Sequence, residues 1–210
     1  MTASTASTAT SASSAGTEER MNDFIAALQQ LDAGSLARLR RNAGNSLAES
    51  RGVLDVFYRI APFGLSAAQE ERYFLVATLY QPRLDPPASE SSRPPNPGNF
   101  GDTLRRVADP REDGSAGVQR RLAALLDAEG PQVNFRLRQL VRLVDAHRGA
   151  IDWRQLLHDL LRWDYSDRRT QRAWARSYFG ATNDKPSEPS SLAGEPDDRR
   201  GDLPAGPDPS

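Results

Sequence analysis

Residues 131–161 carry the sequence PQVNFRLRQLVRLVDAHRGAIDWRQLLHDLL, and this stretch decides the fold class. Its apolar residues recur every three or four positions, which is the spacing of an α-helix that buries one face. Gly130 and Pro131 are typical of a helix start, and Asp152 is typical of the N-cap of a second helix. The sequence therefore predicts two amphipathic helices. Their expected buried faces consist of Val133, Leu137, Leu140, Val141 and Val144 in the first helix, and of Trp153, Leu156, Leu157, Leu160 and Leu161 in the second.

The same helical spacing extends through most of residues 18–180, and convincing strand-like alternation is not found. Candidate N-caps precede most of the helical segments, and Ser66 with Gln69 forms the pattern of a capping box. Gly180 is expected to end the last helix in the left-handed conformation. We therefore predict an all-α protein. The other expected N-caps are Ser46, Asn99, Ser115 and Ser166, a short helix is expected over residues 35–42, and Trp174 is expected in the core.

Composition divides the chain into five parts. Residues 1–17 are rich in Ala, Ser and Thr and are expected to form a disordered leader, whereas residues 181–210 are expected to form a disordered acidic tail. Residues 82–98 contain six of the 15 prolines and are typical of a long loop. We therefore predict two small helical bundle lobes, residues 18–81 and residues 99–180, joined by this proline-rich loop.

The net charge of −1 hides an uneven distribution of charge. Between residues 20 and 180 there are 24 arginines against 19 acidic residues, an excess of five positive charges. Residues 1–19 carry two acidic residues and no basic one, and residues 181–210 carry seven acidic against three basic residues. The chain is therefore a basic helical core with acidic ends, and such a core favours a polyanionic partner.

Several classes of function are disfavoured by the sequence. The absence of cysteine excludes disulfides and thiolate metal sites, and the only histidines, His147 and His158, do not have the spacing of a metal motif. Adjacent carboxylates such as Glu70 and Glu71 lie on different faces of a helix, so they do not form a catalytic pair. We therefore expect no enzymatic activity, no metal and no cofactor. With no secretory signal and no membrane-spanning apolar run, a cytoplasmic location is the default expectation.

The arginines provide the best candidate site. On the helix after Pro131, Arg138 and Arg142 share one flank, and only Arg142 has an acidic residue, Asp145, within the next turn. Arg120 is expected to face outward, and Arg121 is expected at the boundary of the core. Guanidinium groups match phosphate geometry, and no base-reading motif accompanies them, so contact with a nucleic-acid backbone is the favoured role. The predicted nucleic-acid-binding residues are Arg40, Arg41, Arg120, Arg121, Arg138 and Arg142.

A set of short segments between residues 21 and 179 resembles, in order and spacing, the small subunit of the type I-E CRISPR Cascade complex, the CasB family. The segments are Leu39-Arg40-Arg41, Val56-Phe57-Tyr58-Arg59, Pro62-Phe63-Gly64, Tyr73–Leu79, Gly98-Asn99-Phe100-Gly101, Leu104-Arg105-Arg106, Gln119-Arg120-Arg121-Leu122, Leu137–Val141 and Ile151-Asp152-Trp153, followed by Leu156-Leu157, Leu160-Leu161 and Trp163. No single segment is diagnostic, but the ordered set is fairly specific.

The resemblance implies an all-helical, non-catalytic protein. Members of the family pair as a dimer within the crRNA-guided complex, beside the other Cascade subunits, and help to hold the target strand and the displaced strand of opened DNA. In such complexes base pairing reads the sequence, and the proteins supply shape and charge. The implied partners are therefore crRNA, both DNA strands, the other subunits and a second copy.

Two other interpretations of the residues remain open. One is a helical regulator that binds duplex DNA, although no recognition helix in a tight three-helix unit is evident. The other is a protein-interaction scaffold whose arginines are neutralised by salt bridges. Retention of the chain on a heparin or single-stranded DNA column, with loss at moderate salt, would distinguish these interpretations.

Overall fold

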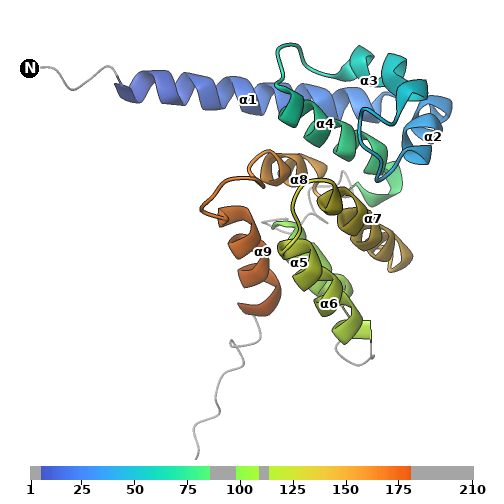
Figure 1. Cartoon of the computed structure of the whole chain (residues 1–210), viewed down its shortest axis with the longest axis vertical. Coiled ribbons are helices and arrows are strands. Elements are labelled where there is room, and N and C mark those ends of the chain that lie inside the picture. Colours follow the sequence, from blue (N-terminus) through green and yellow to red (C-terminus); the bar gives the residue numbers. More distant parts are fainter. Residues whose placement is uncertain (1–5, 86–97, 109–113, 181–210) are drawn as a thin grey trace, which may run out of the picture.

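The computed structural model describes residues 6–85, 98–108 and 114–180, with side-chain surroundings from residue 16 onward (Figure 1). In these residues all regular structure is helical, which confirms the all-α prediction. The nine α-helices of the described residues are α1 (Ala6–Gln29), α2 (Ala33–Arg41), α3 (Leu54–Ile60), α4 (Ala67–Leu79), α5 (Phe100–Val107), α6 (Gly114–Leu126), α7 (Pro131–Ala146), α8 (Trp153–Leu160) and α9 (Arg169–Phe179), and the short 3-10 helices are η1 (Arg51–Val53) and η2 (Pro82–Leu84).

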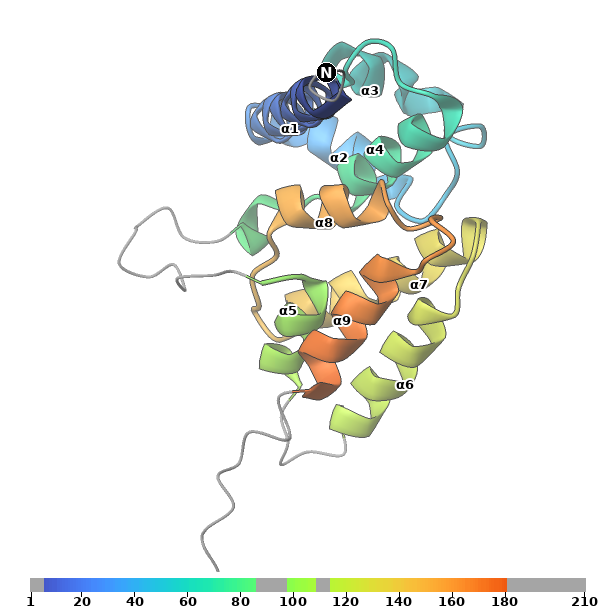
Figure 2. The same ribbon diagram turned by 90° about the vertical axis from the view of Figure 1, so that its left-hand side faces the viewer.

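The helices form two groups with α8 between them (Figure 2). In the first group α1 contacts α3, and α2 contacts both α3 and α4; in the second, α5 packs on α9 and α6 packs on α7. Helix α8 contacts α1 and α4, and α7 also contacts α4. The buried apolar residues of both groups belong to one continuous core. The division into lobes at residues 82–98 stays a prediction.

Among the contacts that join the groups, three lie at or near α8. The backbone N–H of Ile151 donates to the carbonyl oxygen of Leu84 at 2.7 Å, and the ring centroids of Tyr80 and Trp153 lie 5.5 Å apart. Arg72 on α4 pairs with Asp164 after α8, with Nη2 and Oδ2 at 2.7 Å. Helix α4 and the segment that follows it are therefore connected to the start of α8 and to the residues on either side of it.

The apolar residues predicted to be buried in α7 and α8 lie in the core with the exception of Leu161, and Trp174 of α9 is buried as predicted. Trp153, Leu157, Leu160 and Trp174 are all buried, and the ring centroids of Trp163 and Trp174 lie 5.1 Å apart. Leu161 is only half-buried, because it follows the last residue of α8. Helical spacing thus identified the core faces correctly within the helices and less well at their ends.

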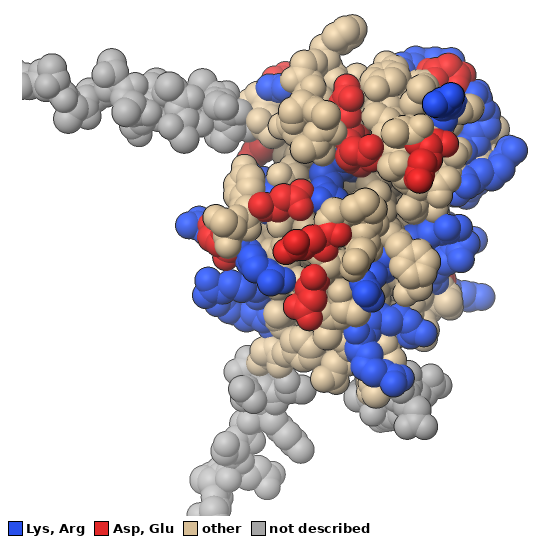
Figure 3. Space-filling view, in the orientation of Figure 1, with Lys and Arg blue, Asp and Glu red and all other residues tan. Residues whose placement is uncertain are grey.

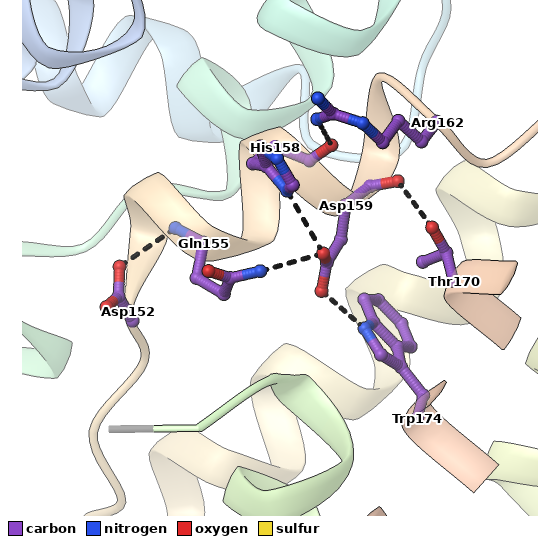
Figure 4. A network of polar contacts seen from close by, with 7 residues as sticks. All are labelled: Asp152, Gln155, His158, Asp159, Arg162, Thr170 and Trp174. Carbon is purple, nitrogen blue, oxygen red and sulfur yellow. Dashed lines mark hydrogen bonds and ion pairs between the residues drawn. The ribbon is translucent and has the colours of Figure 1, made fainter. Parts of the chain in front are cut away.

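Helix α9 is held against α8 by a buried polar network centred on Asp159 (Figure 4). The carboxylate of Asp159 accepts hydrogen bonds from the indole Nε1 of Trp174 at 2.6 Å and from the side-chain amide of Gln155 at 2.8 Å. The hydroxyl of Thr170 donates to the backbone carbonyl of Asp159 at 3.4 Å, and Nδ1 of His158 lies 3.4 Å from the Asp159 carboxylate. His158 therefore takes part in a structural network.

Four predicted helix starts are confirmed. Ser66 and Gln69 form a capping box, Asp152 accepts from the backbone N–H of Gln155 at 2.9 Å, and Pro131 opens α7. The side chain of Asn99 caps α5 by accepting from backbone N–H groups of its first turn. In each of these helices the capping signal is local in sequence.

Other predicted helix ends are wrong. The short helix expected over residues 35–42 begins earlier, at Ala33, with Asp32 as its N-cap. The hydroxyl of Ser46 donates to Glu49 instead of capping α3. Ser115 lies inside α6, and α9 begins after Arg168 instead of after Ser166. Gly180 has a φ of −70°, so it is not the expected left-handed stop. Where several Ser, Asp or Gly residues lie close together, tertiary contacts select among equivalent local signals.

The N-terminal segment also differs from the prediction. Helix α1 begins at Ala6, inside the predicted leader of residues 1–17. Alanine has the highest helix propensity, so a helix that is anchored further along can extend back through this segment. Residues 1–5, 86–97 and 181–210 lie outside the described residues, and they include most of the predicted loop and the whole predicted acidic tail.

Candidate nucleic-acid interface

A hollow of about 230 Å³ lies where α2, the end of α4, η2 and α7 meet. Three of the six predicted arginines line it, namely Arg40 from α2 and Arg138 with Arg142 from α7. These residues are far apart in the sequence, and the packing of α4 against both α2 and α7 places them around one opening. Its other lining residues are Ala43, Thr78, Leu79, Gln81, Arg83, Val141 and Asp145.

Arg138 is the half-buried arginine of the hollow. Its side chain lies against Gly44, where an added Cβ atom would be 3.1 Å from Cδ and 3.6 Å from Nη1 of Arg138. Gly44 has a φ of +89°, a conformation that glycine adopts without strain. The Nε atom of Arg138 is buried and has no hydrogen-bond partner in the described structure. Because this atom is closed to solvent, any contact of Arg138 with an outside partner would involve another part of its guanidinium group.

Arg142 is exposed one helical turn after Arg138. The sequence suggested that Asp145 neutralises Arg142, but in the structure the guanidinium of Arg83 donates to the Asp145 carboxylate. Sequence analysis did not identify Arg83, because it lies on η2 within the predicted loop, and its adjacent prolines gave no signal of a functional residue. Arg83 thus occupies the nearby carboxylate and adds a further guanidinium to the wall of the hollow.

On α2, neighbouring arginines have different roles. Arg38 forms an ion pair with Asp55, with Nη2 and Oδ1 2.6 Å apart, and donates to the backbone carbonyl of Gly52 at 2.8 Å. The Asp55 carboxylate raises the pKa of Arg38, and Arg38 in turn lowers the pKa of Asp55. Arg40 and Arg41 are exposed, but only Arg40 lines the hollow; Nε of Arg41 donates to the carbonyl of Ala37 at 3.3 Å. Arg38 therefore joins two helices, whereas Arg40 faces the opening.

Arg120 and Arg121 are exposed on α6 and do not line the hollow. Arg121 was expected at the core boundary, so the structure gives it a more solvent-accessible position than the sequence suggested. The structure thus brings Arg40, Arg138 and Arg142 together and leaves the α6 pair outside that group.

Ion pairs with carboxylates involve some of the arginines and leave others without such a partner. Of the residues whose side chains are described, the arginines that lie within 4.0 Å of a carboxylate are Arg38, Arg72, Arg83, Arg105, Arg168 and Arg169. Within the same residues none of the six predicted arginines does so. In Figure 3 basic side chains gather along the right-hand side, where Figure 1 shows α2 and α7. The unpaired guanidinium groups make this a candidate surface for an anion.

Two observations concern other kinds of site. In the described part of the chain no three His, Asp or Glu side chains converge in the manner of a metal site. None of the helices described is both long enough and apolar enough to span a bilayer.

Comparisons with known proteins agree with one another. Residues 35–179 match the family described as CRISPR-associated protein Cse2. A curated relative of the same description from Thermus thermophilus is 43% identical over 170 residues, which cover 78% of this chain and 90% of the relative. The crystal structure of M. ruber CasB superposes with a TM-score of 0.61 at 31% identity, covering 78% of this chain and 94% of that chain. A chain of a CRISPR RNA-guided surveillance complex has the same fold, with a TM-score of 0.61 at 22% identity over 77% of this chain and 92% of its own length.

Proposed function

The chain belongs to the CRISPR-associated Cse2 family, and from this premise we propose that it is a non-catalytic small subunit of a crRNA-guided surveillance complex of the type I-E Cascade class. In this role it binds the nucleic-acid backbone and stabilises target DNA after the guide has opened the duplex. Its partners are crRNA, the target and displaced strands, the other subunits and a second copy of itself.

The observation that carries the proposal is the hollow lined by Arg40, Arg138 and Arg142. Each of these side chains lacks a carboxylate partner among the described residues. A guanidinium presents five N–H donors in a planar fork, which suits the oxygens of a phosphate group. Several unpaired guanidinium groups around one opening favour a phosphodiester backbone over a neutral ligand.

The surroundings of Arg138 favour binding that is independent of sequence. Its contact with Gly44 restricts the side chain to one region of the hollow, and no carboxylate pairs with its guanidinium among the described residues. A phosphate oxygen is an acceptor that every nucleotide supplies, so such a contact carries no base information. Base pairing with a guide would then provide the sequence specificity.

The alternative of a scaffold with neutralised arginines receives less support. Arg38 and Arg72 have carboxylate partners that connect helices, as that hypothesis requires. Arg40, Arg138 and Arg142 have no such partner among the described residues, and burying an unpaired charge in a protein interface is costly unless the partner supplies an anion. A duplex-binding regulator remains the second alternative, and a preference for duplex over single-stranded DNA would favour it.

The test replaces Arg138 and Arg142 together by alanine. Each phosphate contact that is lost on a single strand reduces the magnitude of the slope of log K against log salt by about 0.7. Loss of both arginines should therefore reduce this slope by about one to one and a half. The matched control replaces Arg172 and Arg176, exposed residues also four apart on α9. Binding of single-stranded DNA by the isolated chain and retention of opened target by the assembled complex are the two measurements.

In the proposed role, the Arg138 and Arg142 variant binds single-stranded DNA more weakly and retains less opened target, to the same extent for all target sequences. The control variant changes neither quantity by a comparable amount. Circular dichroism and thermal unfolding must show that both variants retain the helical fold. If the first variant binds and retains DNA as the unaltered chain does, the hollow does not bind the backbone, and the scaffold alternative is favoured.

A further inference from the structure

One carboxylate lies among the guanidinium groups of the arginine-lined hollow. The charged side chains that line the hollow are four arginines and a single acid, Asp145. Asp145 is in the last turn of α7, three residues after Arg142, and its side chain is 22% exposed. A negative charge in the wall of a proposed phosphate site repels the anion that the arginines attract. Asp145 therefore acts against the site that surrounds it.

Helix geometry gives no reason for a carboxylate at this position. The C-terminal end of an α-helix carries partial negative charge from its free carbonyl groups, so a basic residue is favourable there and an acidic one is unfavourable. The last turn of α7 contains Asp145 and no basic residue. The charge of Asp145 must therefore be compensated from outside α7.

Arg83 supplies this compensation. It belongs to η2, and its Nη2 donates to Oδ2 of Asp145. The side chain of Arg83 is 67% exposed against 22% for Asp145, so the carboxylate is the fixed member of the pair and the long arginine side chain extends to it. Without that carboxylate, the guanidinium of Arg83 would be free to turn into the hollow beside Arg142.

The position of η2 does not depend on this ion pair. Leu84 is only 1% exposed, and its carbonyl oxygen accepts from the backbone N–H of Ile151 at 2.7 Å. The backbone N–H of Asp85 also donates to the carbonyl of Pro82 at 3.1 Å, which closes the turn. An ion pair with a largely exposed arginine contributes little to stability. The charge of Asp145 is therefore expected to act mainly on the hollow.

We propose that Asp145 is an internal competitor of phosphate, which binds Arg83 and keeps its guanidinium from the nucleic-acid backbone. The hollow then contacts the backbone through its other three arginines. A carboxylate and a phosphate oxygen accept from the same guanidinium N–H groups, so one excludes the other at Arg83. Binding by the chain alone is thereby weakened, and retention of DNA depends more on pairing with the guide. This inference rests on the proposed function, because it describes how the same hollow is restrained.

The experiment measures binding of an oligothymidylate by the isolated full-length chain over a range of salt concentrations. Asp145→Asn keeps the shape of the side chain and removes its charge, so Arg83 is released. This variant should bind about two- to fivefold more tightly, as expected for one exposed charge contact. The magnitude of the slope of log K against log salt should increase by about 0.7, the value for one further phosphate contact on a single strand.

Three controls isolate the role of Arg83. Arg83→Ala alone should leave the slope unchanged, because Asp145 already withholds that side chain. In a chain that carries Arg83→Ala, the further change Asp145→Asn should not increase the slope, because no guanidinium is released. Asp167→Asn alters the net charge equally and frees Arg169, whose Nε lies 2.7 Å from Oδ2 of Asp167, but neither residue lines the hollow. This third variant should bind as the unaltered chain does.

Several results would overturn the proposal. An unchanged slope in Asp145→Asn would show that the released arginine makes no phosphate contact, and a reduced slope in Arg83→Ala alone would show that Asp145 does not withhold it. An increase that persists in the Arg83→Ala chain, or that Asp167→Asn reproduces, would assign the effect to net charge alone. A lower melting temperature of Asp145→Asn with unchanged DNA binding would make the ion pair a structural link between η2 and α7.

The variants also separate this inference from the proposed function. Replacement of Arg138 and Arg142 by alanine tests whether the hollow binds the backbone at all, and it should reduce the slope whether or not Asp145 withholds Arg83. A reduced slope in that variant together with no increase in Asp145→Asn would leave the proposed function intact and refute the competitor. If neither variant changes the slope, both proposals fail.

Discussion

The indole Nε1 of Trp174 donates to Oδ2 of Asp159 at 2.6 Å inside the core, and this hydrogen bond connects α9 to α8. The same carboxylate accepts from the side-chain amide of Gln155, so its removal leaves two donors without a partner. We expect Asp159→Ala to lower the free energy of unfolding by about 2–4 kcal/mol, because unsatisfied buried donors add to the lost hydrogen bonds.

Urea unfolding followed by tryptophan fluorescence measures this effect. Asp159→Asn, which retains one carbonyl oxygen as an acceptor, should be less destabilising than Asp159→Ala. If the two variants are equally stable, the network in Figure 4 contributes packing alone.

Trp153 offers a second test of the core. The residue is buried against Tyr80 at a centroid distance of 5.5 Å, yet its indole Nε1 has no hydrogen-bond partner in the described structure. Trp153→Ala should cost about 3–5 kcal/mol, since it opens a large cavity. Trp153→Phe should cost much less, because it keeps the ring contact and removes an unsatisfied donor. Equal losses in the two variants would show that the N–H group is satisfied in solution.

The contact between α5 and α9 depends on Gly101. A Cβ atom added there would lie 2.2 Å from the backbone carbonyl oxygen of Trp174, so the two helices would have to separate. Gly101→Ala should therefore destabilise the protein by about 1–3 kcal/mol or more. Gly52→Ala is the matched control, since an added Cβ at Gly52 meets nothing within 4 Å. Thermal unfolding of both variants is the measurement, and similar melting temperatures would contradict the close packing.

Asp85 should make stability depend on pH. Burial raises the pKa of its carboxyl group, although the hydroxyl of Tyr80 donates to it at 2.6 Å and opposes that shift. A carboxyl whose pKa is raised on folding contributes most to the free energy of unfolding below its unfolded pKa, which is about 4. This contribution to stability is lost as the pH rises through the folded pKa.

The corresponding variant is Asp85→Asn, which does not titrate. Its stability relative to the unaltered chain should improve as the pH rises from about 3 to about 7. Other groups cancel in this difference, provided that the variant leaves their pKa values unchanged. Urea unfolding at several pH values supplies the measurement, and a difference that is independent of pH would show that Asp85 ionises equally easily in both states.

Local features of the fold were predictable from the sequence. The apolar stripe of α7 and the caps at Ser66, Asn99 and Asp152 each depend on residues within one or two turns, so their spacing alone identifies them. Helix ends with competing signals were less predictable: Ser166 was expected to cap α9, but the helix begins after Arg168, whose φ is +50°.

The candidate site was only partly predictable. The shared flank of Arg138 and Arg142 follows from the period of α7, whereas the period of α2 did not predict the exposed position of Arg40. Their convergence depends on how α4 packs between these helices, and the pairing of Arg83 with Asp145 joins η2 to α7. No local pattern encodes such contacts.

Arg138 has a structural role and a proposed binding role, and two substitutions separate them. Its aliphatic stem packs against Gly44, whereas its guanidinium is the group proposed to contact phosphate. Arg138→Met keeps much of the stem volume and removes the charge; Arg138→Ala removes both. Both variants should bind single-stranded DNA more weakly, with a salt slope reduced by about 0.7, because both lose one phosphate contact. Only Arg138→Ala should also lose stability, and Arg138→Met should unfold close to the unaltered chain. Retained DNA binding by a stable Arg138→Met variant would restrict Arg138 to packing and would leave Arg40 and Arg142 as the proposed contacts.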